Sequence, residues 1–461
     1  MDMLSALAQG FAVAITPTNL ALALFGCFAG TLIGALPGLG PVNGVAILIP
    51  LAFSLGLEPT SALIMLSCIY YGCMYGGRIS SIMLNIPGDE PAIMTTLDGY
   101  PMARAGKASE ALAISAVASF IGATFATIGL TLFAPLLAKA AIYFGPADYF
   151  ALYVMAFATI GGITSVNPFK TLLAAFIGLM IATVGTDPVS GVNRFTYGSP
   201  ELLGGVPFIL VMVGVFAVSE LLVQSGKPEW ARGGEVQTRI KLPSFAMLKR
   251  LRKPQLIGSG IGLFEGCMPG AGGSIAAFMA YNEARRWSKK PEEFGKGSPE
   301  AIAAPESANN TVAGTALVPM LSFGIPGSNS TAILLGGLLI HGLQPGPLLF
   351  EKHPDFIYGL FGGLFVANMS LFIIGVAVLT PAIWLVNRPK PYLLAAIYAL
   401  IFSGIYSIDH SLFDLYLVLG AGAIGYVMRL LGFPFLPLVL GLVLGYLIEA
   451  NYRRSLLLTN G

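Results

Sequence analysis

Long apolar stretches without a single charged residue constrain this chain more than any other feature. Four of them cover residues 3–57, 112–138, 356–387 and 391–408. Each is long enough to cross the hydrocarbon core of a bilayer, which takes about 20 residues of α-helix. Inside a bilayer the backbone must satisfy its own hydrogen bonds, and a helix does so within one segment. The sequence therefore predicts an all-α, polytopic membrane protein.

The composition supports this class and excludes several others. Only 10% of the 461 residues are charged, whereas soluble proteins carry about 25%. The formal net charge of +2 gives no basic excess with which to hold nucleic acid. The four cysteines and three histidines show no metal-binding spacing, and the chain lacks nucleotide-binding and hydrolase motifs. We therefore expect the lipid bilayer as its surroundings, no metal, no cofactor other than a coupling cation, and no enzymatic activity.

A basic segment divides the chain into two halves that resemble each other. Residues 226–254 contain eight Lys and Arg against two Glu, which is typical of a cytoplasmic loop. The pattern G-x-[LM]-P-G-x-G occurs at 34–40 and at 266–272, and a second Pro-Gly turn follows at 85–88 and at 324–327. These matches predict a first transmembrane repeat, a basic cytoplasmic linker and a second transmembrane repeat, in residues 1–225, 226–254 and 255–461.

The charges of corresponding connectors differ between the halves. Residues 54–61 contain no Lys or Arg, whereas their counterparts at 285–296 contain five. The next pair reverses this bias, because 104–107 holds two basic residues and 341–355 only one. Lys and Arg favour the cytoplasmic side of a membrane. We therefore predict two inverted repeats of about five spanning helices each, plus broken or re-entrant Gly-Pro hairpins.

The Pro-Gly turns inside apolar segments indicate a binding site. Pro removes a backbone donor and Gly permits positive φ, so such turns interrupt helices at membrane depth. The freed N–H and C=O groups are tolerated where they line a cavity, and half-helix ends there bind ions. A plain proline kink or close helix packing is the alternative interpretation.

Four such turns, paired by the duplication, favour a site at the interface of the repeats. We predict that a carboxylate substrate binds Pro37, Gly38, Gly40, Asn43, Arg78, Ser80, Asn85, Pro87, Gly88, Pro269, Gly270, Gly272, Gly273, Ser274, Asn310, Gly327, Ser328, Asn329 and Ser330. Oxygens of Asn, Ser and Thr side chains are suitable ligands for a weakly held hard cation. We predict that the coupling ion uses Asn309, Asn310, Thr311, Ser328 and Asn329.

Arg78 is the one cation among these polar residues. An Arg within the membrane is costly unless it is paired. Arg78 is therefore either a partner for the carboxylate of a substrate or the mate of a structural Asp or Glu, and the sequence favours neither. Asp89 and Glu90 follow the first turn, where we expect them at the water interface as helix-capping residues. The polar run before the second turn begins with Glu306.

Six blocks spread over nearly the whole chain resemble the large permease subunit of the tripartite tricarboxylate transporters. They are GALPGLGP at 34–41, YGGRISSIMLNIPGDEPA at 75–92, DGYPMARAGKASEAL at 98–112, PGAGGS at 269–274, PESANNTVAG at 305–314 and FGIPGSNSTAILLGGL at 323–338. The resemblance implies a multi-pass permease of the bacterial inner membrane that imports organic anions such as citrate, driven by a sodium or proton gradient. It also implies two partners, a small membrane subunit and a periplasmic substrate-binding protein. A membrane channel or scaffold subunit without coupled transport is the alternative.

Overall fold

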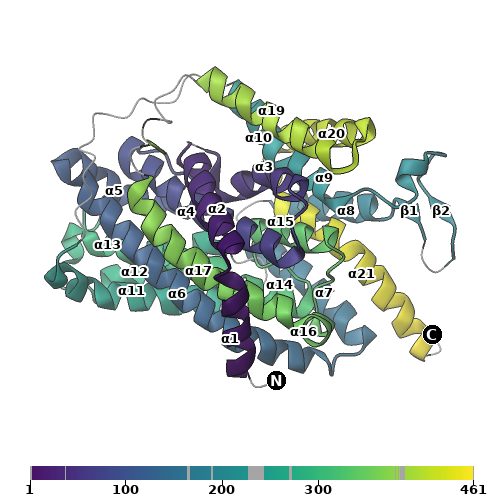
Figure 1. The fold of residues 1–461 in the computed structure, drawn as a ribbon, viewed down its shortest axis with the longest axis horizontal. Coiled ribbons are helices and arrows are strands. Elements are labelled where there is room, and N and C mark those ends of the chain that lie inside the picture. The colour runs from purple at the N-terminus through teal and green to yellow at the C-terminus, as the bar shows by residue number, and fades with distance from the viewer. Residues whose placement is uncertain are drawn as a thin grey trace.

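The computed structural model describes residues 3–459 except 37, 164–166, 188–189, 227–242, 269–271, 379–380, 383 and 385–389. Figure 1 shows that this part of the chain is almost entirely helical, with one short hairpin, β1 and β2, at its edge. The elements before the linker are α1 (Met3–Ala14), α2 (Pro17–Ala35), α3 (Gly40–Ser54), α4 (Pro59–Leu84), α5 (Ala92–Met102), η1 (Ala103–Lys107), α6 (Ala108–Ala141), α7 (Pro146–Ile163), α8 (Pro168–Ala182), β1 (Gly185–Thr186), β2 (Asn193–Arg194), η2 (Pro200–Leu202), α9 (Phe208–Met212), η3 (Val213–Val218) and α10 (Ser219–Ser225).

Helices also make up the second half. The elements are α11 (Phe245–Gly266), α12 (Gly272–Trp287), η4 (Pro291–Glu293), α13 (Pro299–Thr315), α14 (Leu317–Phe323), α15 (Asn329–Ile340), α16 (Pro347–Lys352), α17 (Pro354–Ala377), α19 (Lys390–Asp409), α20 (Leu412–Leu430) and α21 (Phe435–Thr459). Residues 245–254 of the predicted linker therefore belong to α11, whereas residues 227–242 lie outside the described part of the chain.

Seven helical segments of the described residues are long and apolar enough to cross a membrane. They are Pro17–Ala35, Ala92–Ala141, Phe208–Ser225, Pro354–Gly375, Pro391–Ile408, Leu412–Leu430 and Phe435–Leu458. Shorter apolar helices, among them α3, α8 and α15, accompany them. These segments confirm the predicted class of all-α polytopic membrane protein. The inverted arrangement of the two halves stays a prediction.

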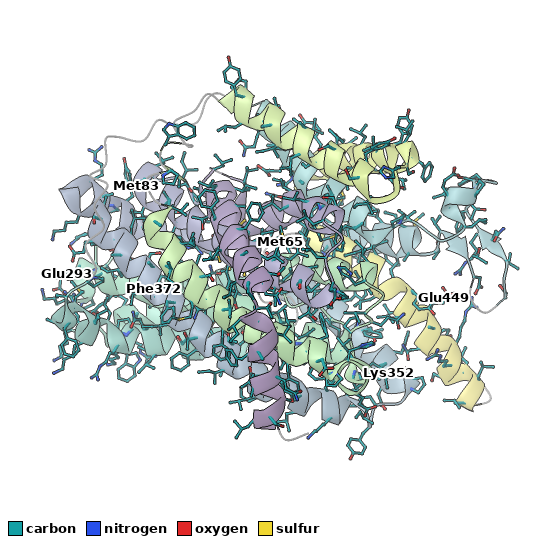
Figure 2. All side chains as sticks on the ribbon, in the orientation of Figure 1. Met65, Met83, Glu293, Lys352, Phe372 and Glu449 are labelled. Carbon is teal, nitrogen blue, oxygen red and sulfur yellow. The ribbon has the colours of Figure 1, made fainter. Side chains whose placement is uncertain are left out.

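Helix α4 lies at the centre of the hydrophobic core. It begins with Pro59, whose missing N–H costs nothing in the first turn of a helix, and its residues 62–82 are all buried. Met65, in the middle of the molecule in Figure 2, is fully buried. Because α4 is enclosed by other helices, any polar side chain in this stretch must find its partners within the protein.

Glycines let α2 pack closely on α4. A Cβ atom on Gly30 would lie 2.3 Å from the carbonyl oxygen of Ile69, so the two backbones approach more closely than a larger residue permits. Helix α11 repeats this arrangement on α13, where a Cβ on Gly258 would lie 2.1 Å from the carbonyl oxygen of Ala304. The contact glycines, spaced four residues apart in both helices, are Gly26, Gly30 and Gly34 in α2 and Gly258, Gly262 and Gly266 in α11. This shared packing supports the predicted duplication.

Connectors from the two halves meet in pairs. The Asp98 carboxylate of α5 accepts hydrogen bonds from the Tyr281 hydroxyl and from three backbone N–H groups in residues 295–298. The connector after α3 meets the connector after α15, where the rings of Phe53 and His341 lie 5.1 Å apart. The two basic connectors are thus neighbours, and so are the two connectors that are poor in Lys and Arg. Inverted repeats are expected to place their connectors in this way, and the inversion itself stays a prediction.

Candidate functional site

The first Pro-Gly turn ends helix α4 and folds the chain back against it. Asn85 adopts the left-handed conformation at φ 59°, which closes the helix. Gly88 then packs against Gly77 so closely that a Cβ on Gly88 would lie 2.3 Å from the Gly77 Cα. This reversal brings Asp89 back alongside Arg78, which lies nearly two turns before the end of α4.

Arg78 is fully buried and forms ion pairs with two carboxylates. Its Nη1 lies 2.6 Å from Asp89 Oδ1, and its Nε lies 2.9 Å from Glu306 Oε2. The side chains of Arg78 and Glu306 are each 1% exposed, and that of Asp89 is 10% exposed. The third guanidinium nitrogen, Nη2, is buried and has no hydrogen-bond partner among the described residues. In this conformation Arg78 is therefore the mate of structural carboxylates, and its role as a substrate ligand stays a prediction.

Glu306 joins α13 of the second half to three helices of the first. Besides Arg78 on α4, it accepts hydrogen bonds from the Thr95 hydroxyl on α5 and from the Ser119 hydroxyl on α6, the latter at 3.4 Å. Asn310, one turn further along α13, donates to Ser119 at 2.9 Å. A charged cluster therefore lies between the two predicted repeats, and both carboxylate oxygens of Glu306 accept hydrogen bonds within it.

Residues that follow both G-x-[LM]-P-G-x-G motifs contact the turn at 85–90. A Cβ on Gly40 would lie 2.8 Å from the carbonyl oxygen of Gly88. The Ser274 hydroxyl, at the start of α12, donates to Glu90 Oε2 at 3.1 Å. The structure thus brings the ends of two motifs, 232 residues apart in the sequence, to the same turn.

The second Pro-Gly turn contributes hydroxyl groups to the same region. Ser328 caps α15 by accepting a hydrogen bond from the backbone N–H three residues later, at 3.2 Å. Ser328 and Ser330 lie near the Tyr70 side chain of α4. Asn329 Oδ1 is buried without a hydrogen-bond partner among the described residues. The second turn therefore lies close to the helix that carries Arg78.

Other predicted site residues lie in several different settings. Ser80 and Thr311 donate their hydroxyl hydrogens to backbone carbonyls one turn earlier in their helices. Gly38 contacts the side chain of Gln224 on α10, away from the Arg78 cluster. Asn43 and Asn309 each keep a buried side-chain atom without a partner in the described part of the chain. Gly273 lies against Asn309, Gly327 lies against Ala316, Gly272 begins α12, and Pro37, Pro269 and Gly270 lie outside the described residues. Their roles as ligands stay predictions.

Glu306 is the residue of this cluster to which the sequence analysis gives no role. A charge count supplies the missing signal, because an Arg in the membrane requires an anion and Glu306 is the acidic residue of the polar run before the second turn. Asp89 does cap a helix as expected, since its Oδ1 accepts from the Ala92 N–H at 2.9 Å. It lies against Arg78, however, whereas Glu90 is exposed.

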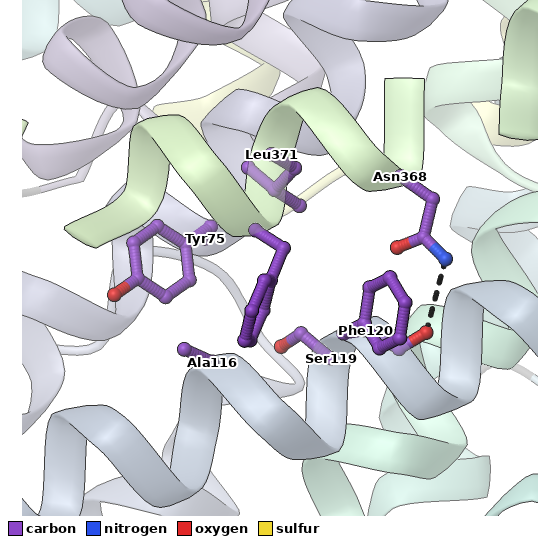
Figure 3. A pocket seen from close by; sticks show the side chains of 7 residues that line it. Tyr75, Ala116, Ser119, Phe120, Asn368 and Leu371 are labelled. Carbon is purple, nitrogen blue, oxygen red and sulfur yellow. Dashed lines mark hydrogen bonds between the residues drawn. The ribbon is translucent and has the colours of Figure 1, made fainter. Parts of the chain in front are cut away.

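A narrow crevice between α6 and α17 reaches the edge of this cluster. Figure 3 shows its lining, in which the Ser119 hydroxyl that contacts Glu306 lies beside Phe120. Asn368 spans one end with a hydrogen bond to the Phe120 carbonyl oxygen at 3.0 Å. The crevice is too narrow for a water molecule. A substrate therefore passes through this crevice to the cluster only if the surrounding helices move.

Comparisons with known proteins agree over most of the chain. A sequence model described as the "Tripartite tricarboxylate transporter TctA family" matches residues 20–440. An uncharacterised 52.8 kDa protein in the TAR-I ttuC' 3' region of Agrobacterium vitis is 37% identical over 462 residues, covering 100% of this chain and 91% of that relative. An uncharacterised protein in the TAR-II ttuC' 3' region of the same species is 34% identical over 200 residues, covering 43% of this chain and 83% of that relative. The residues matched by the family model include the whole Arg78 cluster.

Proposed function

The chain belongs to the tripartite tricarboxylate transporter TctA family, and on this premise we propose that it is the permease subunit through which organic carboxylates enter a bacterium across the inner membrane. Citrate and related di- and tricarboxylates form the expected substrate class. Import is driven by a sodium or proton gradient. A periplasmic substrate-binding protein delivers the substrate, and a small membrane subunit completes the transporter.

The observation that carries this proposal is the unpartnered Nη2 of the buried Arg78. A guanidinium held in place by Asp89 and Glu306 is already oriented, so little conformational freedom is lost when a carboxylate binds it. Charge-assisted hydrogen bonds from Arg to a carboxylate are among the stronger polar contacts in proteins. The hydroxyls of Ser328 and Ser330 and the N-terminus of α15 add donors for an anion on the other side of α4.

The cluster also suggests how access alternates between the two sides of the membrane. Arg78, Asp89 and Thr95 belong to the first half, whereas Glu306 belongs to the second. The contact between Arg78 and Glu306 therefore links the halves directly. In this proposal, movement of one half against the other opens the site first to one side and then to the other.

Uptake of labelled citrate into vesicles tests the proposal. The vesicles contain this chain, the small membrane subunit and a panel of binding proteins, under an imposed sodium or proton gradient. We expect saturable accumulation that requires both the binding protein and a gradient. Flux that neither saturates nor responds to a gradient would favour the channel alternative. If no carboxylate of the panel moved while the complex was intact, the proposed substrate class would be wrong.

Arg78→Lys tests the contact that carries the proposal. Lys keeps the positive charge but loses the planar fork of donors. Since a hydrogen bond to a charged group contributes about 1.5–3 kcal/mol, we expect uptake to fall about ten- to hundredfold. Arg285→Lys, at an exposed position in the last turn of α12, is the matched control and should transport normally. Wild-type uptake by Arg78→Lys would show that Arg78 supplies only a positive field.

The polar residues around the second turn have a separate test. Uptake and its ion dependence are measured for Asn310→Ala, Ser328→Ala and Asn329→Ala, each at normal expression. We expect at least one of these variants to change the ion dependence, because their oxygens are the proposed ligands of the cation. If all three variants behaved as wild type, the proposed cation ligands would be wrong.

A further inference from the structure

We propose that Glu306 is the proton-carrying group of this transporter, and that its protonation releases one edge of the Arg78 guanidinium to a carboxylate of the substrate. The inference rests on the proposed function, because it names the residue at which a proton enters the transport cycle. It concerns the contact between the two halves that the previous section describes.

Glu306 occupies one of the two nitrogens on the Nε–Nη2 edge of the Arg78 guanidinium. In a guanidinium, the N–H of Nε and one N–H of Nη2 point the same way and together match the two oxygens of a carboxylate. In this structure Glu306 lies on Nε, with Oε1 at 2.8 Å and Oε2 at 2.9 Å. Nη2 has no partner among the described residues. A carboxylate that replaced Glu306 would bind both nitrogens, whereas Glu306 binds one.

The charges of the cluster favour uptake of a proton. Arg78 carries +1, and Asp89 and Glu306 carry −1 each when ionised, which leaves −1 among three side chains that are at most 10% exposed. A buried charge without compensation is unfavourable, and a carboxylate avoids it by taking up a proton. One of the two carboxylates is therefore the place where a proton is bound.

The hydrogen-bond partners identify Glu306 as that carboxylate. Its oxygens are contacted by the hydroxyls of Thr95 and Ser119, and a hydroxyl can donate to an ionised carboxylate or accept from a protonated one. Asp89 is instead held by Arg78 Nη1 and by the Ala92 backbone N–H, which can only donate. Glu306 thus keeps hydrogen bonds in both protonation states, whereas the groups that contact Asp89, both at Oδ1, offer no acceptor for a proton.

Few other titratable groups face Glu306. Among the described residues, those that interact with it are Arg78, Asp89 and Tyr75. From α5 and α6 it is approached by the uncharged Thr95 and Ser119. The helices packed on the other sides of α13 present small side chains and glycines, such as Gly258 and Gly262 of α11 and Ala276 and Ala280 of α12.

The exchange balances in atoms and charge. One O–H bond forms on Glu306 with a proton from the bulk solution, and no covalent bond breaks in the substrate. The neutral acid leaves Arg78 Nε, and a substrate carboxylate takes its place on Nε and Nη2. The formal charge of the cluster is −1 before and after the step. Each substrate molecule bound at Arg78 is therefore accompanied by one proton.

Infrared spectroscopy of the purified chain tests protonation without any substrate. Spectra are recorded over a pH series in sodium-free buffer for wild type, Glu306→Gln and the matched control Glu300→Gln. Glu300 lies on the same helix but pairs with Arg250 outside the cluster, at 2.8 Å. We expect a carboxylic-acid C=O band that wild type and Glu300→Gln share and that Glu306→Gln lacks. The inference is overturned if the bands of wild type and Glu306→Gln are the same.

Transport by the assembled three-part system tests coupling, with labelled citrate as the probe and the membrane potential held at zero. If one proton accompanies each substrate, a gradient of one pH unit supports about tenfold accumulation. Wild type and Glu300→Gln should reach this level. Glu306→Gln should exchange internal for external citrate but equilibrate without accumulation. Accumulation by Glu306→Gln equal to wild type overturns the inference, as does wild-type accumulation that follows only a sodium gradient.

A measurement on the wild type alone covers the case in which Glu306→Gln does not fold. In weak buffer with a pH indicator, addition of citrate to the assembled transporter should remove about one proton per bound substrate from solution. No change in pH would overturn the inference. The infrared result distinguishes failure of this inference from failure of the proposed function. If the Glu306 band is absent, the inference fails but the protein can still import carboxylates. If the band is present and citrate does not move, the assignment of the substrate fails and the inference does not.

Discussion

The two Pro-Gly turns have the same backbone but carry different side chains. Asn85 and Gly324 both adopt the left-handed conformation, and in each turn the next N–H donates to the carbonyl six residues earlier, at 3.4 Å in the first copy and 3.3 Å in the second. After the first turn comes Asp89, an anion that pairs with Arg78. After the second comes Ser328, a neutral helix cap. The duplicated backbone thus supports one charged and one uncharged surface.

The helices before the turns differ in the same way. Helix α4 corresponds to α13 and α14 at the spacing that pairs Asn85 with Gly324, as the contacts of Gly30 with Ile69 and of Gly262 with Ala308 also show. At this spacing the counterpart of Arg78 is the uncharged Leu317. The Asn310 amide donates to Ser119 and to the carbonyl of Glu306, so it supports the cluster without adding charge. Among the described residues, Arg78 of the first copy and Glu306 of the second therefore form one shared charged centre between the copies. A single charged centre at the interface changes its contacts when one half moves against the other. Two equivalent centres would each lie within one half and would not link the halves.

The largest expected loss of stability comes from removing the charge of Arg78. Arg78→Gln leaves two buried carboxylates without their cation, and removal of one partner of a buried ion pair costs about 3–5 kcal/mol. Arg78→Gln with Glu306→Gln should recover part of this loss, because one of the two carboxylates is then neutral. Asn310→Ala removes an uncharged side chain that supports the same cluster and should cost only about 1 kcal/mol. Unfolding in detergent measures all three variants, and equal losses for Arg78→Gln and Asn310→Ala would show that the charge of Arg78 adds nothing to stability.

The glycines that end the two turns should differ by less. A Cβ on Gly88 would lie 2.3 Å from the Gly77 Cα, whereas one on Gly327 would lie 3.0 Å from the Ala316 Cα. Overpacking a tight core contact typically costs about 1–3 kcal/mol. We expect Gly88→Ala near the upper end of this range and Gly327→Ala near or below its lower end. The midpoint of thermal unfolding measures both, and a larger loss for Gly327→Ala would reverse the comparison.

Much of this arrangement can be predicted from the sequence, and the features that cannot be predicted have physical causes. Charge-free apolar runs imply the membrane class, and the repeated G-x-[LM]-P-G-x-G pattern marks the duplicated halves because few residues besides Pro and Gly break a helix. The sequence also shows that Arg78 needs an anion. It does not show which anion pairs with Arg78, because Glu306 is 228 residues away and only the packing of α13 against α5 and α6 brings it there. Local pattern favours Asp89 as a cap, and tertiary contact adds its second role.

The left-handed residues test whether the shared backbone matters equally in both copies. Gly adopts this conformation freely, whereas for a residue with a Cβ it costs roughly 1–2 kcal/mol, less for Asn. Gly324→Ala should therefore destabilise the protein by about this amount. Asn85→Gly should change stability by no more than about 0.5 kcal/mol, since it removes strain but adds freedom to the unfolded chain. Similar losses from the two variants would mean that the Asn85 side chain makes a contact on which the first turn depends.

The smallest effect should separate capping from ligand binding. Ser328 caps α15, and Ser411 caps α20 through the Asp414 N–H at 3.3 Å, away from the Arg78 cluster. Loss of a serine cap costs about 1 kcal/mol, so Ser328→Ala and Ser411→Ala should lower the unfolding midpoint similarly. Only Ser328→Ala should also reduce citrate uptake, because its hydroxyl lies beside Tyr70 on the helix that carries Arg78. Equal uptake by the two variants would mean that the uncharged copy contributes structure alone, and that the anion is bound by the charged copy.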